Sequence, residues 1–286
     1  MKTLKLILAV AIVAMTAACC GTKNETPKDQ KILVLYYSQT GNTKAVAEEI
    51  ASRLNADIEE LSLTDPYDGD FQATIERCKK EREDSTLCYI YPIASHIEDY
   101  DVIFIGYPVW FGTFAPPFVH LFLNEDFSGK KIVPFCTFGS GGLESSVKDI
   151  AAMQPNAEIL PGFGIRAARM DAMPKEVEQF LIASGFLEGD YTAPADFPEQ
   201  HPVSEEETAI FNAAVDGYPM LNAEAISVAS REIADGTEYL FSARDLPREM
   251  PAVAKGDKKP DLPPAGEMKI YVTVNADKTE FTRVVR

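Results

Sequence analysis

Apolar runs alternate with amphipathic stretches from residue 31 to residue 187. The runs "KILVLYYS" and "DVIFIGYP" are apolar on both faces, which is typical of strands buried in a parallel sheet. After the first run, Val46, Ala47 and Ile50 share one side of a helix, with Glu48 and Glu49 opposite. The pattern predicts strands within 31–38, 57–63, 101–108, 130–142 and 157–166, and helices within 43–55, 65–84, 116–125, 143–153 and 174–187.

Five strands that alternate with helices predict an α/β domain with a doubly wound parallel sheet and right-handed crossovers. Pro134 is unfavourable in a central strand because it has no N–H to donate. Ligands in such sheets bind beyond the carboxyl ends of the strands. We therefore expect a ligand site in the loops that follow the strands.

The period of the pattern changes in the last third of the chain. Residues 204–217 predict a helix, with Ser204 and Glu207 spaced as a capping box. The stretches 223–233, 237–246, 268–275 and 279–285 alternate apolar and polar residues, as antiparallel strands with one wet face do. We predict a domain over 30–190, a linker over 191–203 and a smaller α+β domain over 204–286, with one helix and about four antiparallel strands.

The first residues predict an export signal. Lys2 and Lys5 precede a short apolar run that ends in small residues, and the run is shorter than the roughly 20 residues of a membrane-spanning helix. "TAAC", which ends at Cys19, resembles a bacterial lipobox without its usual leucine. We predict a signal peptide over 1–18, lipidation of Cys19 and a tether over 19–29. The protein is then exported to the bacterial cell envelope, with a lipid anchor as its only membrane contact; ordinary cleavage without a lipid is the alternative.

Composition limits the partners. The chain has 286 residues, of which 46% are hydrophobic, so it can bury a sizeable core. Its formal net charge of −17 argues against nucleic acid as a partner and permits steering towards basic surfaces.

Cysteine and histidine offer no catalytic or metal-binding pattern. The remaining cysteines, Cys78, Cys88 and Cys136, lack zinc-site spacing. A disulfide between Cys78 and Cys88 and free thiols both stay open. The three histidines are scattered along the chain, so we expect no metal site and no hydrolytic site.

The loop "SQTGNT" carries the first candidate chemistry. It joins a strand to a helix, so the hydroxyls of Ser38, Thr40 and Thr43 and several backbone N–H groups converge at a helix N-terminus. The loop has neither the Walker pattern nor the dinucleotide fingerprint. Neutral donors of this kind suit a single terminal phosphate; a plain cluster of helix-capping residues is the alternative.

Two later loops add a planar aromatic side chain and several glycines. Trp110, the one tryptophan, lies at a strand end, where its indole could stack on a planar ring or simply pack. Gly112, Gly139, Gly141 and Gly142 would let the backbone approach a ligand closely, or would serve turn geometry alone.

With these loops, residues 30–190 resemble the flavodoxin family. "VLYYSQTGNTKAVAEEI" follows the family's phosphate loop, while "GYPVWFGTFAPP" and "CTFGSGG" follow the two loops that hold the isoalloxazine ring of FMN. The resemblance implies the strand order 2-1-3-4-5, FMN as cofactor, and a peptide at Gly112 that rearranges with redox state. The implied cofactor-binding residues are Ser38, Gln39, Thr40, Gly41, Asn42, Thr43, Pro108, Val109, Trp110, Phe111, Gly112, Thr137, Phe138, Gly139, Ser140, Gly141 and Gly142.

The activity that this resemblance implies is electron transfer between a donor and an acceptor that the sequence does not identify. No catalytic residue is assigned, because FMN carries the redox chemistry. An FMN-dependent quinone or nitro-compound reductase is the alternative. In both cases nearby carboxylates would disfavour the anionic reduced flavin.

The last domain resembles the cystatins. "EIADGTEY" matches the strand–loop–strand motif of that family at Gly236, Thr237 and Tyr239, whereas Glu232 and Ala234 stand where the family has glutamine and valine. A binding or inhibitory protein that acts through this domain is a third possible function. With the altered loop we expect no useful inhibition of papain-like proteases.

Overall fold

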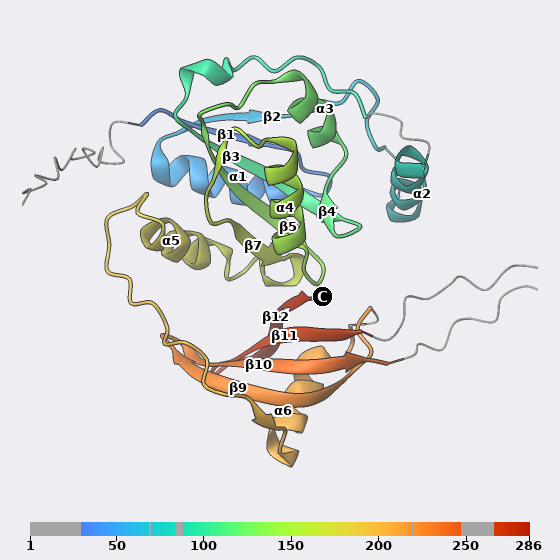
Figure 1. The fold of residues 1–286 in the computed structure, drawn as a ribbon, viewed down its shortest axis with the longest axis vertical. Coiled ribbons are helices and arrows are strands. Elements are labelled where there is room, and N and C mark those ends of the chain that lie inside the picture. The colour runs from blue at the N-terminus through green and yellow to red at the C-terminus, as the bar shows by residue number, and fades with distance from the viewer. Residues whose placement is uncertain (1–29, 69, 84–87, 219, 247–265) are drawn as a thin grey trace, which may run out of the picture.

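The computed structural model describes residues 30–68, 70–83, 88–218, 220–246 and 266–286. The predicted signal peptide, Cys19 and the tether up to residue 29 lie outside the described residues. Figure 1 shows two layered units, one built on a parallel sheet and one on an antiparallel sheet. No helix in the described part of the chain is both long and apolar enough to cross a membrane.

The parallel sheet has the predicted order. Its strands run β2-β1-β3-β5-β6, and β7 also pairs with β5, which is the order 2-1-3-4-5. All residues of β1 are buried, in keeping with its doubly apolar sequence. The strands are β1 (Ile32–Tyr36), β2 (Asp57–Glu60), β3 (Val102–Trp110), β5 (Lys131–Phe138), β6 (Glu158–Ile159) and β7 (Phe163–Arg166).

The predicted strand over 157–166 is split into β6 and β7, and the split accommodates Pro134. Pairing of β5 with β6 ends at Ile132, and pairing with β7 begins at Phe135. Pro134 lies opposite the gap between β6 and β7. No paired strand residue there needs the backbone N–H that proline lacks.

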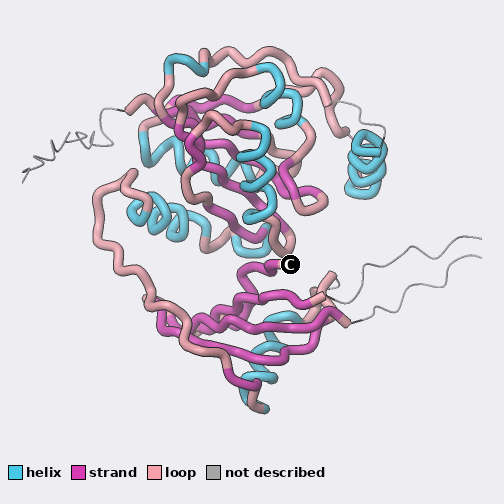
Figure 2. The backbone as a smooth tube through the Cα atoms, viewed as in Figure 1, coloured by secondary structure: helices cyan, strands magenta, loops and turns pink. Residues whose placement is uncertain are grey.

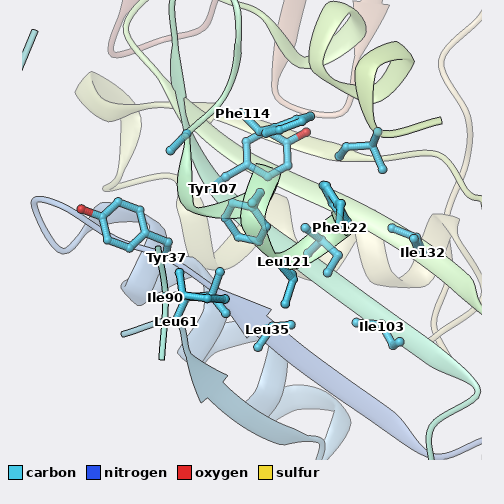
Figure 3. Packing of buried hydrophobic residues seen from close by; sticks show 14 of the residues in the cluster. Leu35, Tyr37, Leu61, Ile90, Ile103, Tyr107, Phe114, Leu121, Phe122 and Ile132 are labelled. Carbon is cyan, nitrogen blue, oxygen red and sulfur yellow. The ribbon is translucent and has the colours of Figure 1, made fainter. Parts of the chain in front are cut away.

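Helices cover both faces of this sheet. On one face Leu35 and Ile103 pack with Leu121 of α3 (Figure 3). Ile150 of α4 belongs to the same buried cluster. The strand residues that alternate with Leu35 and Ile103 pack on α1 and α5. The helices are α1 (Asn42–Leu54), α3 (Pro117–Asn124), α4 (Leu143–Met153) and α5 (Met173–Ala183).

Some short elements lie beyond the predicted pattern. They are the hairpin strand β4 (Thr113–Phe114), the 3-10 turns η2 (Ile97–Asp99) and η3 (Ala167–Arg169), and strand β8 (His201–Pro202). Helix α2 (Phe71–Glu83) lies within the stretch 65–84, where a helix was predicted.

The second unit is an antiparallel sheet of order β12-β11-β10-β9-β8 with α6 on one face (Figure 2). The capping box of α6 is present, because Ser204 accepts from the Glu207 N–H and Glu207 accepts from the Ser204 N–H. The elements are α6 (Glu205–Val215), β9 (Ala223–Ile233), β10 (Gly236–Asp245), β11 (Glu267–Val274) and β12 (Thr279–Val285).

The predicted linker packs across the other face of this sheet. The Gln200 amide donates to the Leu240 carbonyl over 3.0 Å and accepts from the hydroxyls of Ser227 and Ser242. The Arg231 guanidinium lies 4.2 Å from the centroid of the Phe197 ring. These contacts tie the connection between the units to the second sheet.

Candidate functional site

A cavity of about 580 Å³ opens at the carboxyl ends of β1, β3 and β5. This is the edge where a doubly wound sheet binds ligands. Its lining comes from the three loops singled out in the sequence, from α2 and from the turn after β7. The lining residues are Gln39, Thr40, Asn42, Asp70, Thr74, Ile75, Cys78, Pro108, Val109, Trp110, Phe111, Thr137, Phe138, Gly139 and Ala167.

The first loop leaves a helix N-terminus open towards the cavity. Gly41 is the N-cap of α1 in a left-handed conformation (φ 90°), and no side chain caps the helix. The Ser38 hydroxyl accepts from the Gly41 N–H at 3.1 Å, so it folds the loop and is not part of the lining. The first N–H groups of a helix have no partner within it, which suits an anion near Thr40 and Asn42.

Thr43, a predicted cofactor-binding residue, contacts the third loop. Its side chain is 1% exposed, and its hydroxyl lies 2.8 Å from that of Thr137 in the third loop. It neither caps α1 nor lines the cavity. Thr43 therefore joins the first loop to the third, and Thr137 is the member of the pair that reaches the cavity.

Gln39 ties the first loop to the segment before α2. Its amide oxygen accepts from the Tyr37 hydroxyl, and its amide nitrogen donates to the Tyr67 carbonyl over 2.6 Å. The Tyr67 hydroxyl donates to Glu81 of α2 over 2.6 Å, and burial raises its pKa well above its usual range. This chain of bonds helps to hold α2 beside the cavity.

Trp110 forms an aromatic wall with two tyrosines. Its ring meets Tyr67 edge to face at 5.1 Å between centroids, and Tyr37 likewise at 6.1 Å. Such contacts fix the orientation of the indole in the cavity wall.

The turn after Trp110 is a tight hairpin between β3 and β4. Phe111 and Gly112 both have positive φ, 53° and 80°, as a two-residue turn of type I′ requires. Ser145 of α4 donates to the Gly112 carbonyl, and Thr113 donates to Asp149 over 2.5 Å. These bonds place Phe111 at the rim of the cavity, where it is 52% exposed, while Gly112 lies outside the lining.

Only the first half of the third loop lines the cavity. Thr137, Phe138 and Gly139 do so, whereas Ser140, Gly141 and Gly142 turn away. Gly142 is the N-cap of α4 at φ 118°, and a Cβ there would lie 2.5 Å from Val109. The latter part of the loop is thus packed on protein.

Helix α2 supplies residues that the sequence analysis missed. Thr74 and Cys78 are buried and, with Ile75 and Asp70, line the cavity. The available signal was the pair of less polar residues four apart in a charged helix, which share one face. No feature of the sequence indicated that Ala167, in the turn after β7, would line the cavity.

The cavity is electrostatically simple. Among the described lining residues, Asp70 alone is charged, and it accepts from the Ala73 N–H over 2.9 Å at the start of α2. The described residues contain no cluster that could hold a metal ion.

Cys78, Cys88 and Cys136 are buried and form no disulfide. Burial raises the pKa of the Cys88 and Cys136 thiols, so both stay protonated and unreactive at neutral pH.

A family model described as flavodoxin matches residues 31–179, more than half of the chain. The chain belongs to the flavodoxin family. No curated protein matches it.

Several solved structures are similar to part of this chain. A protein from Bacteroides eggerthii assigned as a flavoprotein is 26% identical (TM-score 0.49), covering 55% of this chain and 98% of that one. A Lactobacillus acidophilus flavoprotein in complex with FMN is 24% identical (TM-score 0.43), covering 47% and 93%. Oxidised flavodoxin 2 from Bacillus cereus is 20% identical (TM-score 0.35), covering 54% and 96%.

Proposed function

We propose that the chain binds FMN in the cavity above β1, β3 and β5 and transfers electrons through it. The observation that carries the proposal is that all three predicted loops contribute to one cavity of about 580 Å³. That volume lies within the range of about 300–1,000 Å³ found for small-molecule sites. Membership of the flavodoxin family supports FMN as the occupant.

The phosphate would be held at the first loop. Gly41 leaves the N-terminus of α1 uncapped, and Thr40 and Asn42 add side-chain donors beside it. The described lining has no cationic side chain, so neutral donors and the helix dipole would neutralise the phosphate charge. This donor set fits one terminal phosphate.

The flavin ring would lie between the second and third loops. Trp110 and Phe111 offer aromatic surface on one side, and Gly139 offers backbone without a side chain on the other. Bound FMN supplies the redox chemistry. These residues bind and orient the ring and exclude water from it.

The test is the visible spectrum of the purified protein, followed by titration of the flavin-free protein with FMN and riboflavin. Riboflavin has the same ring without the phosphate. Replacing Thr40 by Val removes a hydrogen bond to a charged group, worth roughly 1.5–3 kcal/mol, so FMN should bind about tenfold more weakly or worse.

Riboflavin binding should change far less in Thr40→Val. Thr208→Val, in α6 of the second unit, is the matched control and should leave both affinities unchanged. A colourless protein that does not bind FMN would refute the proposal. Equal losses for the two ligands would show that the loop binds no phosphate.

An FMN-dependent quinone or nitro-compound reductase is the alternative to an electron carrier, since the bound flavin would supply the redox chemistry in both. The net charge of −17 suits partners with basic surfaces. Steady consumption of NAD(P)H with a quinone by the FMN-loaded protein would favour the reductase instead.

We also propose that Cys19 is lipidated after export, as its lipobox-like context indicates. Replacing Cys19 by Ala should release the protein from membranes and leave FMN binding intact. A soluble, unlipidated parent protein would contradict this. The second unit, with its helix and four sequential long strands, is further proposed to be cystatin-like.

A further inference from the structure

The second unit reaches the loop that lines the cavity. In Figure 1, β12 is the strand of the second sheet nearest to the parallel sheet. Its Val284 N–H donates to the Ser140 carbonyl over 2.6 Å. A Cβ on Gly141 would lie 2.0 Å from the Val284 carbonyl oxygen, so the close approach of the two backbones requires glycine at this position.

Arg166, at the end of β7, also joins the third loop to β12. Its Nε donates to the Gly139 carbonyl over 2.9 Å, and its Nη1 donates to the Phe281 carbonyl of β12 over 2.8 Å. The guanidinium carbon lies 3.4 Å from the centroid of the Phe281 ring. Arg166 does not line the cavity, but Gly139, which it holds, does.

The guanidinium of Arg166 is buried between the third loop and β12. The residue is 7% exposed and forms no ion pair within the described part of the chain. The nearby Glu280 is already paired with Arg169 at 2.9 Å and with Lys278 at 2.9 Å. A buried cation without a carboxylate is costly unless its hydrogen bonds are satisfied, and it projects positive potential through a medium that screens it poorly.

We propose that the second unit positions the third loop through Arg166 and thereby sets the affinity and redox potential of the flavin; this rests on the proposed function. Two backbone carbonyls and the rings of Phe281 and Tyr218 hold the guanidinium, and in turn it fixes Gly139. Its positive charge stabilises the negatively charged reduced flavin. This local effect offsets the overall acidity, which acts in the opposite direction.

The experiment compares Arg166→Gln with Arg169→Gln in the whole protein. Both changes remove one cation from the same turn, but Arg169 pairs with Glu176 and Glu280 and does not contact the loop. Amide hydrogen exchange of residues 137–142 is measured without flavin. The affinity for oxidised FMN and the redox potential are measured with it.

We expect Arg166→Gln to speed exchange in the loop, because the Gly139 carbonyl loses a hydrogen bond from a charged donor. Oxidised FMN should bind at least about tenfold more weakly, because part of its binding free energy is then spent on ordering the loop. Reduced FMN should lose more affinity than oxidised FMN, so the potential becomes more negative. Arg169→Gln should leave these values close to those of the parent protein.

Arg166→Lys separates position from charge. It keeps the cation but loses the planar fork that contacts two carbonyls, so loop exchange should rise while the potential stays near its parent value. If Arg166→Gln does not fold, hydrogen exchange of residues 137–142 in Arg166→Lys tests whether Arg166 positions the loop. Parent-like loop exchange in either variant would overturn the inference. A parent protein that binds no FMN would refute the proposed function, and exchange in the flavin-free protein would still test the positioning of the loop.

Discussion

The hydroxyls of Thr43 and Thr137 join the first loop to the third beneath the cavity, at a distance of 2.8 Å. Thr43 was expected in the site as a hydroxyl at a helix N-terminus, and Thr137 because the resemblance to the flavodoxin family implied it. Their direct contact, across 94 positions, depends on β1 and β5 both flanking β3, which local patterning does not specify. Sequence could therefore indicate polar loops at a shared edge, but not which hydroxyl faces the ligand and which faces protein.

At the residue scale, Thr43→Val should destabilise the protein by about 1–3 kcal/mol, because it leaves the buried Thr137 hydroxyl without its partner. The affinities for FMN and riboflavin should fall by the same factor, whereas Thr40→Val should lower the affinity for FMN far more than that for riboflavin. Urea unfolding of Thr43→Val, Thr137→Val and the double variant measures this. The double variant should cost less than the two single costs added. Additive costs would mean that the hydroxyls are not coupled.

Elements were predictable where periodicity is strong. The range of α4 matches its prediction, and β9 and β12 do as well, because each has a clear apolar face and a turn or cap at its ends. For α2 the sequence predicted only a helix within 65–84, with no part in the ligand site. Its role beside the cavity depends on the Gln39 and Tyr67 contacts, which join segments far apart in sequence.

At the element scale, Ile75→Ala should weaken FMN binding about fivefold. The shorter side chain would bury less apolar surface against the flavin, and we take the loss as about half the free energy of burying an isoleucine side chain, or roughly 1 kcal/mol. Riboflavin should lose as much, since the contact is apolar. Gln72→Ala is the control on the same helix, because Gln72 is exposed and donates to Glu76. Equal effects of the two substitutions in flavin titrations would show that α2 does not border the bound flavin.

For the whole molecule, sequence established two units but not how they meet. The contacts of Arg166 with Phe281 and of Val284 with Ser140 span more than a hundred positions and use backbone atoms, which leave no trace in side-chain pattern. Gly141 was predicted either to let a ligand approach or to serve turn geometry, and its missing side chain also admits β12, which neither prediction included.

The docked arrangement also bears on protease inhibition. The β9–β10 hairpin, with Asp235 at its tip, and α5 flank a cleft of about 900 Å³. Lys175 of α5 bridges the cleft to Asp235. This pair is more than half exposed and contributes little to stability, so the obstacle to a protease is steric. The cleft is far too small to admit one.

We therefore expect the whole protein not to inhibit papain-like proteases, even when its loop is restored by Glu232→Gln with Ala234→Val. Those changes recover the motif residues but leave α5 facing the hairpin. Lys175→Ala added to them should not restore inhibition, because it removes a weak ion pair and leaves the helix in place. Residual protease activity at increasing concentrations of each variant measures this. Tight inhibition by the restored-loop protein would show that the altered residues, and not the position of α5, prevent inhibition.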